Sequence, residues 1–218
     1  MKERSMDSGE LERSTSSPSA KLHIRRITEG AACKHVKIEL TDGSSFYVPP
    51  DILIEHVLHE GSEVSEELYE LLAEETVALA AYEKAVDYLA RREHSRFELQ
   101  QKLYNKEFPP EAVRRALDTC EDLGYLDDER FARLWSEQRI RRKPEGPKMI
   151  GAKLAQKGVS HDIVERVVGE LFTGERLLDT LYRAAERGRR RTGDDPEKLK
   201  KYLLSRGFLL TQINEYMR

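Results

Sequence analysis

The sequence contains few cysteines and no long apolar run. Its 218 residues include only Cys33 and Cys120, which are far apart and form no CxxC pair, so we expect Cys120 to be a small core residue in a reducing compartment. No apolar stretch approaches the roughly 20 residues that span a bilayer. The N-terminus has no apolar centre of the kind found in a secretory signal. These absences predict a cytoplasmic protein with no membrane partner.

Signatures of catalysis are also scarce. No segment matches the GxxxxGK[ST] phosphate-binding loop, and no Ser or Cys stands in a recognisable nucleophile context. His56 and His59, with Glu55 and Glu60, have a spacing that permits a metal site without specifying one, and we expect surface histidines. The sequence therefore predicts no enzymatic activity, no metal and no cofactor.

One acidic pair needs a decision, because the stretch GYLDDERFA places Asp127 beside Asp128. Asp127 is at the position expected for the N-cap of a helix, and Asp128 falls in the first turn, where the helix dipole favours negative charge. The sequence offers no histidine nearby, and no set of further carboxylates that would converge on the pair, to complete a catalytic group. We therefore predict that Asp127 is a structural cap, and a hydrolase using both aspartates is the alternative.

Charged residues are abundant and are unevenly distributed along the chain. Charged residues make up 35% of the chain, and the formal net charge is −3. Residues 1–80 contain 8 basic and 16 acidic residues, whereas residues 81–218 contain 29 basic and 24 acidic ones. An acidic first part followed by a basic remainder favours a polyanionic partner for the second part.

The chain is expected to begin with a disordered, Ser-rich tail over residues 1–21 and a small strand segment over residues 22–75. The runs LHIRRI, KHVKIEL and SFYV are rich in β-branched and aromatic residues, and Asp-Gly within TDGS predicts a hairpin turn. Ser65 is expected to begin a helix that follows this strand segment.

From residue 76 onward the pattern is helical and repeats. The segments around Leu103, Leu154 and Leu203 are alike, with the leucines 51 and 49 residues apart. Such a period is typical of stacked helical repeats. The sequence thus predicts a mostly α protein made of three tandem three-helix repeats in a curved, elongated array, after a small N-terminal β-strand segment. The expected repeats are residues 76–123, 124–172 and 173–218.

Local signals mark the ends of these helices. Ser95 and Glu98 form the pattern of a capping box. Gly158 and Gly207 follow helices at positions that favour a left-handed residue, and Glu107 replaces glycine in the first repeat. The first helix of each repeat is expected to bury an apolar stripe, which places Trp135 and Tyr182 in the core.

Basic residues gather at the end of the first helix of each repeat. Because stacked repeats place equivalent positions in register, we expect these clusters to lie on one face that meets phosphates or an acidic surface. Basic residues at helix C-termini are also favoured by the helix dipole, so part of the pattern has a structural explanation. The candidate partner-binding residues are Arg91, Arg92, Arg96, Arg139, Arg141, Arg142, Lys143, Lys148, Lys153, Lys157, Arg187, Arg189, Arg190, Arg191, Lys198 and Lys201.

Three segments resemble the RecX family, regulators of the bacterial recombinase RecA. They are ALAAYEKAVDYLARREHSRFELQQKL, ALDTCEDLGYLDDERFARLWSEQR and GAKLAQKGV, which occur in order at the spacing of that family over roughly residues 76–170. The third repeat resembles the family more weakly, and Glu107 departs from its usual glycine. The N-terminal strands are similar to an extension that some members carry.

The resemblance implies a regulator, mostly an inhibitor, that lodges in the groove of the RecA nucleoprotein filament and suppresses ATP hydrolysis and strand exchange. It also implies a role in homologous recombination, DNA repair and the SOS response. We expect a monomer whose partners are the RecA–DNA filament and, secondarily, the DNA phosphate backbone. The alternative is a stand-alone DNA-binding protein that uses MIGAKLAQKGVSHDIVERVV as a helix-turn-helix-like pair.

Overall fold

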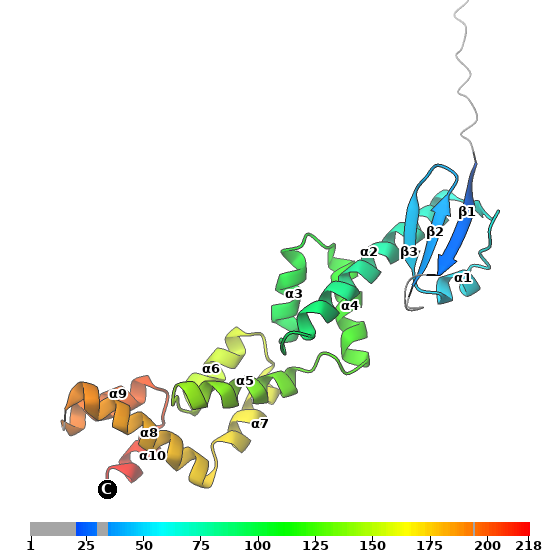
Figure 1. Ribbon diagram of the computed structural model, residues 1–218. Coiled ribbons are helices and arrows are strands. Elements are labelled where there is room, and N and C mark those ends of the chain that lie inside the picture. The colour runs from blue at the N-terminus through cyan, green and yellow to red at the C-terminus, as the bar shows by residue number, and fades with distance from the viewer. Residues whose placement is uncertain (1–20, 30–34, 194) are drawn as a thin grey trace, which may run out of the picture. The chain divides into compact units, whose positions relative to one another are not determined.

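The computed structural model describes residues 21–29, 35–193 and 195–218 (Figure 1). The chain forms two compact units, which divide between Leu72 and Ala73. Most of the predicted tail, and Cys33, lie outside the described residues. None of the helices in the described ranges is both long and apolar enough to cross a membrane.

The first unit contains a four-stranded antiparallel sheet in the order β3-β2-β1-β4. Its buried side chains include Ile24, Ile38 and Val48, which come from three strands. The predicted hairpin is present, since Gly43 has a φ of +91° and Leu40 N donates to Ser44 O over 2.9 Å. The elements are β1 (Leu22–Glu29), β2 (Val36–Leu40), β3 (Ser45–Val48), α1 (Asp51–Glu55) and β4 (Glu63–Val64). The sequence predicted β1, β2 and β3, but β4 is too short to show an alternating pattern.

Helix α2 (Glu66–Leu89) begins in the first unit and continues into the second. The strand segment predicted over residues 22–75 ends inside this helix. The helix continues because no glycine or proline interrupts residues 66–89. Ser65 accepts a hydrogen bond from Leu68 N over 3.2 Å, as expected for a residue that begins a helix.

The rest of the second unit is helical, and its helices follow one another in triplets. The remaining helices are α3 (Arg96–Tyr104), α4 (Pro110–Asp122), α5 (Asp128–Arg142), α6 (Pro147–Gln156), α7 (His161–Leu171), α8 (Gly174–Thr192), α9 (Pro196–Ser205) and α10 (Leu210–Tyr216). The equivalent residues Leu103, Leu154 and Leu203 are all fully buried, each in a separate apolar cluster. The prediction of a mostly α protein of three-helix units is confirmed.

Cys120 lies in the cluster of the first triplet and is fully buried. Burial raises the pKa of its thiol to about 11. The residue is therefore a small apolar core residue, as the sequence indicated.

The expected apolar stripes are partly wrong. Tyr182 is 56% exposed and Leu134 is 48% exposed, whereas Trp135 is half-buried against the cluster of the second triplet. In α8 the buried face consists of Leu181 together with small residues such as Ala184, so Tyr182 lies beside that face rather than on it.

Successive triplets meet at a recurring joint, in which a turn of one triplet rests on the start of the second helix of the triplet before it. Gly146 N, at the start of α6, donates to Arg206 O over 2.8 Å. At the start of α3, Ser95 Oγ donates to Lys157 O over 2.6 Å and also accepts from Glu98 N. The Glu98 carboxylate pairs with Lys157 and Arg92, so only the serine half of the predicted capping box is present.

The joints explain the glycines of these turns. Gly158 has a φ of +79°, and a Cβ there would lie 2.2 Å from Phe97 Cβ. Gly207 has a φ of +86°, and a Cβ there would lie 2.4 Å from Met149 N. Glu107, at the equivalent place in the first triplet, also adopts a positive φ of 63° and is exposed. Glycine is thus required by close packing at two of the three turns.

Candidate binding surface

The last turns of α5 and α8 carry six of the sixteen predicted basic residues. Two arginines of α8 bind the carbonyl end of α5. Arg183 Nη2 donates to Arg141 O over 2.8 Å, and Arg187 Nη1 donates to Arg142 O over 3.1 Å. These bonds satisfy carbonyl groups that have no partner inside α5, and they fix α8 against the end of α5.

Three hollows adjoin one another along this surface, because each shares a residue with the next. The first is lined by Arg92, Glu93, Phe131, Leu134, Trp135, Glu137, Gln138 and Arg141. The second is lined by Trp135, Gln138, Arg139, Arg142 and Lys143. The third is lined by Lys143, Pro144, Arg187, Arg190, Arg191, Tyr202 and Arg206. We call this continuous surface the basic track.

Few acids oppose the cations of the basic track. The acids that line it are Glu93 and Glu137, and both pair with arginines outside it, Arg130 at 2.8 Å and Arg176 at 3.0 Å. Within the described residues, no carboxylate lies within 4.0 Å of Arg141 or Arg142. The track therefore presents net positive charge together with the apolar side chains of Leu134 and Trp135, and it suits an anionic partner.

Arg139 and Lys153 have a different environment, because both bind Glu145. The Glu145 side chain is 3% exposed, and its Oε2 lies 2.8 Å from Arg139 Nε and 2.7 Å from Lys153 Nζ. Burial alone would raise the pKa of Glu145, but the hydrogen bonds from Arg139 and Lys153 outweigh it and hold the pKa below its usual value. These two cations are committed to an internal network between α5 and α6.

Other predicted residues also have internal partners. Arg96 binds Asp118 at 2.6 Å and Glu121 at 2.5 Å. Lys157 binds Glu98, Arg189 binds Glu186 at 3.0 Å, and Lys198 binds Asp195 at 3.2 Å. Arg91, Lys148 and Lys201 are exposed and do not line the three hollows. The structure thus brings together Arg92, Arg139, Arg141, Arg142, Lys143, Arg187, Arg190 and Arg191 on the basic track.

One cation of the track, Arg206, was not among the predicted binding residues, and neither was its neighbour Tyr202. Arg206 caps the C-terminus of α9, and its Cζ lies 5.0 Å from the centre of the Tyr202 ring. A signal was available, because Lys157 occupies the equivalent place in the second triplet and was included. Only the fold shows that the turn after α9 meets the end of α5.

Asp127 and Asp128 each accept hydrogen bonds from backbone amides at the start of a helix. Asp127 Oδ1 accepts from Glu129 N over 2.8 Å and from Arg130 N over 2.9 Å, so the predicted cap of α5 is present. Asp128 Oδ1 accepts from Arg96 N, the first residue of α3, over 2.7 Å. Burial raises the pKa of Asp128, and this bond to the amide acts in the opposite direction. The pair therefore fixes two helices to each other.

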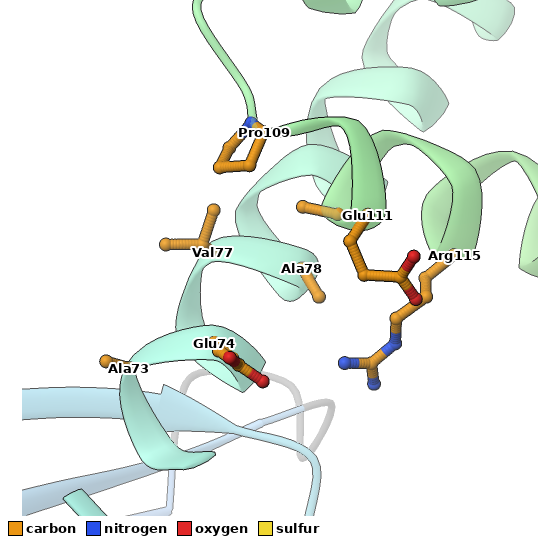
Figure 2. A pocket seen from close by; sticks show the side chains of 8 residues that line it. Ala73, Glu74, Val77, Ala78, Pro109, Glu111 and Arg115 are labelled. Carbon is orange, nitrogen blue, oxygen red and sulfur yellow. The ribbon is translucent and has the colours of Figure 1, made fainter. Parts of the chain in front are cut away.

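A further hollow of about 340 Å³ lies between α2 and α4 (Figure 2). Val77 and Ala78 supply an apolar wall, and Arg115 pairs with Glu75 at 2.7 Å. Over the described residues, no group of three or more His, Cys, Asp or Glu side chains is arranged to hold a metal ion.

The fold and the track define a class of protein, an array of three-helix repeats with a positively charged surface. The family models for the first and second three-helix domains of RecX match residues 81–120 and 127–168. The regulatory protein RecX of Chlorobium phaeobacteroides is 33% identical over 138 residues, which cover 62% of this chain and 89% of the relative. The regulatory protein RecX of Prosthecochloris aestuarii is 35% identical over 131 residues, which cover 59% of this chain and 85% of the relative. The chain therefore belongs to the RecX family of regulatory proteins.

Solved structures agree with this fold. A crystal structure of a regulatory protein RecX superimposes with a TM-score of 0.76, covering 88% of this chain and 97% of the other at 23% identity. The structure of RecX from Lactobacillus salivarius gives a TM-score of 0.59 over 65% of this chain, also at 23% identity. At this level of identity the likeness concerns the fold alone.

Proposed function

We propose that this protein is a non-catalytic regulator, mostly an inhibitor, of the recombinase RecA. It acts as a cytoplasmic monomer, binds in the groove of the RecA–DNA filament, and suppresses ATP hydrolysis and strand exchange. Through this action it limits homologous recombination during DNA repair and the SOS response. Membership of the RecX family supports the regulatory role, and the basic track is the observation that supports binding to an anionic filament.

The track offers two kinds of contact at once. Trp135 and Leu134 present apolar area, and Arg141 stands beside them in the same hollow. Buried aromatic side chains and arginines dominate the energy of many protein interfaces. Arg142 and Lys143 continue the positive charge into the second hollow. We infer that the first hollow contacts protein and that the charge beyond it follows the polyanionic axis of the filament.

The test is the ATPase activity of RecA on single-stranded DNA, measured with this protein at a substoichiometric ratio. We expect inhibition by the wild type. The Arg141→Ala, Arg142→Ala variant should need about tenfold more protein for the same inhibition, and its inhibition should depend less on salt. Arg139 is left unchanged because its loss would leave Glu145 short of a partner.

The matched control is Arg25→Gln, Arg26→Gln, which removes two exposed cations from the sheet of the first unit. It should inhibit as the wild type does. Absence of inhibition by the wild type at every salt concentration would remove the proposed function. Equal weakening in both variants would show that overall charge, and not the track, is responsible.

The second candidate is a stand-alone DNA-binding protein that reads bases with α7. The exposed side chains of that helix include Asp162, Glu165 and Glu170, against one arginine, Arg166. Three acidic side chains on the exposed face of α7 would be repelled by the DNA phosphates. Retardation of one duplex in preference to competitor DNA, lost on substitution within α7, would favour this candidate instead.

A further inference from the structure

The third hollow of the basic track is the most strongly charged of the three. Five of its seven lining residues are cations, and none of its lining residues is acidic. They come from separate parts of the chain: Lys143 follows α5, Arg187, Arg190 and Arg191 belong to α8, and Arg206 ends α9. The hollow measures about 290 Å³. In the described part of the chain, none of the five has a carboxylate within 4.0 Å.

Two contacts hold the arginines in place without neutralising them. Arg187 is fixed by its bond to Arg142 O, and the guanidinium of Arg206 lies over the Tyr202 ring. Arg206 Nε is buried and has no hydrogen-bond partner. A buried N–H without an acceptor is costly, and like charges gathered in one hollow repel each other. Both costs fall when an anion with several acceptor oxygens enters.

We propose that this hollow binds a backbone phosphate of nucleic acid. A phosphodiester is a compact anion whose oxygens accept from several guanidinium groups at once, and arginine suits this geometry better than lysine. Four of the five cations are arginines. The hollow contains one aromatic ring, already covered by Arg206, so it offers no free platform on which a base would stack. Recognition is therefore of the backbone and independent of sequence.

This inference deepens the proposed function, since it assigns the DNA of the filament to one end of the basic track. It differs from the helix-turn-helix reading because α7 takes no part in it. It also divides the track by partner: the hollow around Trp135 meets protein, and the hollow around Arg206 meets phosphate.

The experiment uses the full chain and a fluorescent single-stranded oligonucleotide, without RecA, and follows anisotropy at several salt concentrations. The Arg190→Gln, Arg206→Gln variant should bind about tenfold more weakly at low salt. Its slope of log affinity against log salt should fall by about 0.7, because the hollow contacts one phosphate and each phosphate contact on a single strand contributes about 0.7. The control Arg25→Gln, Arg26→Gln carries the same charge change and should bind as the wild type does.

A second measurement identifies the recognised group. An unlabelled oligonucleotide with an uncharged methylphosphonate backbone should fail to compete, whereas the ordinary oligonucleotide of the same sequence should compete fully. Competition by both would overturn the proposal, as would equal losses in the hollow variant and the control. Unchanged oligonucleotide binding with loss of RecA inhibition would assign the hollow to an acidic protein surface instead.

The two proposals fail separately. If the oligonucleotide results hold and the wild type leaves the RecA ATPase unaffected, the phosphate hollow stands without the proposed function. If RecA is inhibited and the hollow variant binds DNA normally, the proposed function stands and the phosphate hollow does not. Melting curves of the variants separate these outcomes from loss of fold.

Discussion

At the scale of single residues, Glu145 is the one buried carboxylate of the described chain, with 2% exposure. Its two cationic partners belong to α5 and α6 and lie next to the basic track. Removing one member of a buried ion network leaves the others uncompensated, which typically costs about 3–5 kcal/mol. Arg139 therefore contributes to the fold as well as to the surface.

We expect Glu145→Gln to lower the free energy of unfolding by about 3 kcal/mol at neutral pH, measured by urea denaturation. The control Glu186→Gln breaks the exposed pair with Arg189 and should cost about 0.5 kcal/mol or less. The pKa of Glu145 is lowered in the folded state, so its stabilisation is present at neutral pH and is lost as pH falls below about 4.5. The difference between wild type and Glu145→Gln should narrow there. A constant difference down to pH 3 would contradict the ionic origin.

At the scale of elements, the turns between the second and third helices are alike in backbone but not in surroundings. Gly158 and Gly207 touch the preceding triplet, whereas Glu107 is exposed and has only its own left-handed backbone to accommodate. A left-handed conformation costs a non-glycine residue roughly 1 kcal/mol. Glycine is thus the favoured residue at all three turns, and close packing adds to its advantage at Gly158 and Gly207.

We expect Glu107→Gly to raise the free energy of unfolding by about 0.5–1 kcal/mol, because it relieves that strain. Gly158→Ala should lower it by about 2 kcal/mol or more, because the added Cβ meets Phe97 in addition to the positive φ. Thermal denaturation of the two variants and the wild type measures both effects. Destabilisation by Glu107→Gly would show that the Glu107 side chain has a favourable role that outweighs its backbone.

Helix positions and helix ends were predictable because their causes are local. The leucine spacing located the repeats, and Asp127, Gly158 and Gly207 marked ends that the structure contains. The pairing of Glu145 with Arg139 and Lys153, and of Asp128 with the start of α3, was not predictable, because each depends on packing between helices. Arg206 was missed for the same reason: its neighbours in the track are distant in sequence.

At the scale of the whole molecule, each triplet has its own apolar cluster, and neighbouring triplets meet at joints of a few residues. In such an array stability is close to a sum of contributions from each repeat and each contact between neighbours. Damage to the last triplet should then remain largely local.

We expect Leu203→Ala, which empties a fully buried position, to cost the last triplet about 2–5 kcal/mol. Amide hydrogen exchange should accelerate strongly in α8, α9 and α10, weakly in α6, and very little in α3 and α4. A uniform acceleration across all three triplets would show instead that the array opens as one cooperative unit. Leu204→Ala, at a 43% exposed neighbour, is the control and should change little.

The joints also give the array a polarity, because in each joint the helix start of one triplet receives the turn of the next triplet. The start of α9 is capped by Asp195, which accepts from Glu197 N and Lys198 N much as Ser95 caps α3, and Ser95 still holds the turn of the next triplet. Asp195 accepts from the start of its helix but cannot donate to a turn carbonyl as Ser95 Oγ does, so the start of α9 shares only the capping half of the joint at α3. A joint of the same kind at the turn of the first triplet would bring a helix start against Glu107. This residue carries a side chain at the position where Gly158, in the second triplet, has only a hydrogen. Of the three turns, the one at Glu107 is therefore the least suited to close contact with the helix start of another triplet.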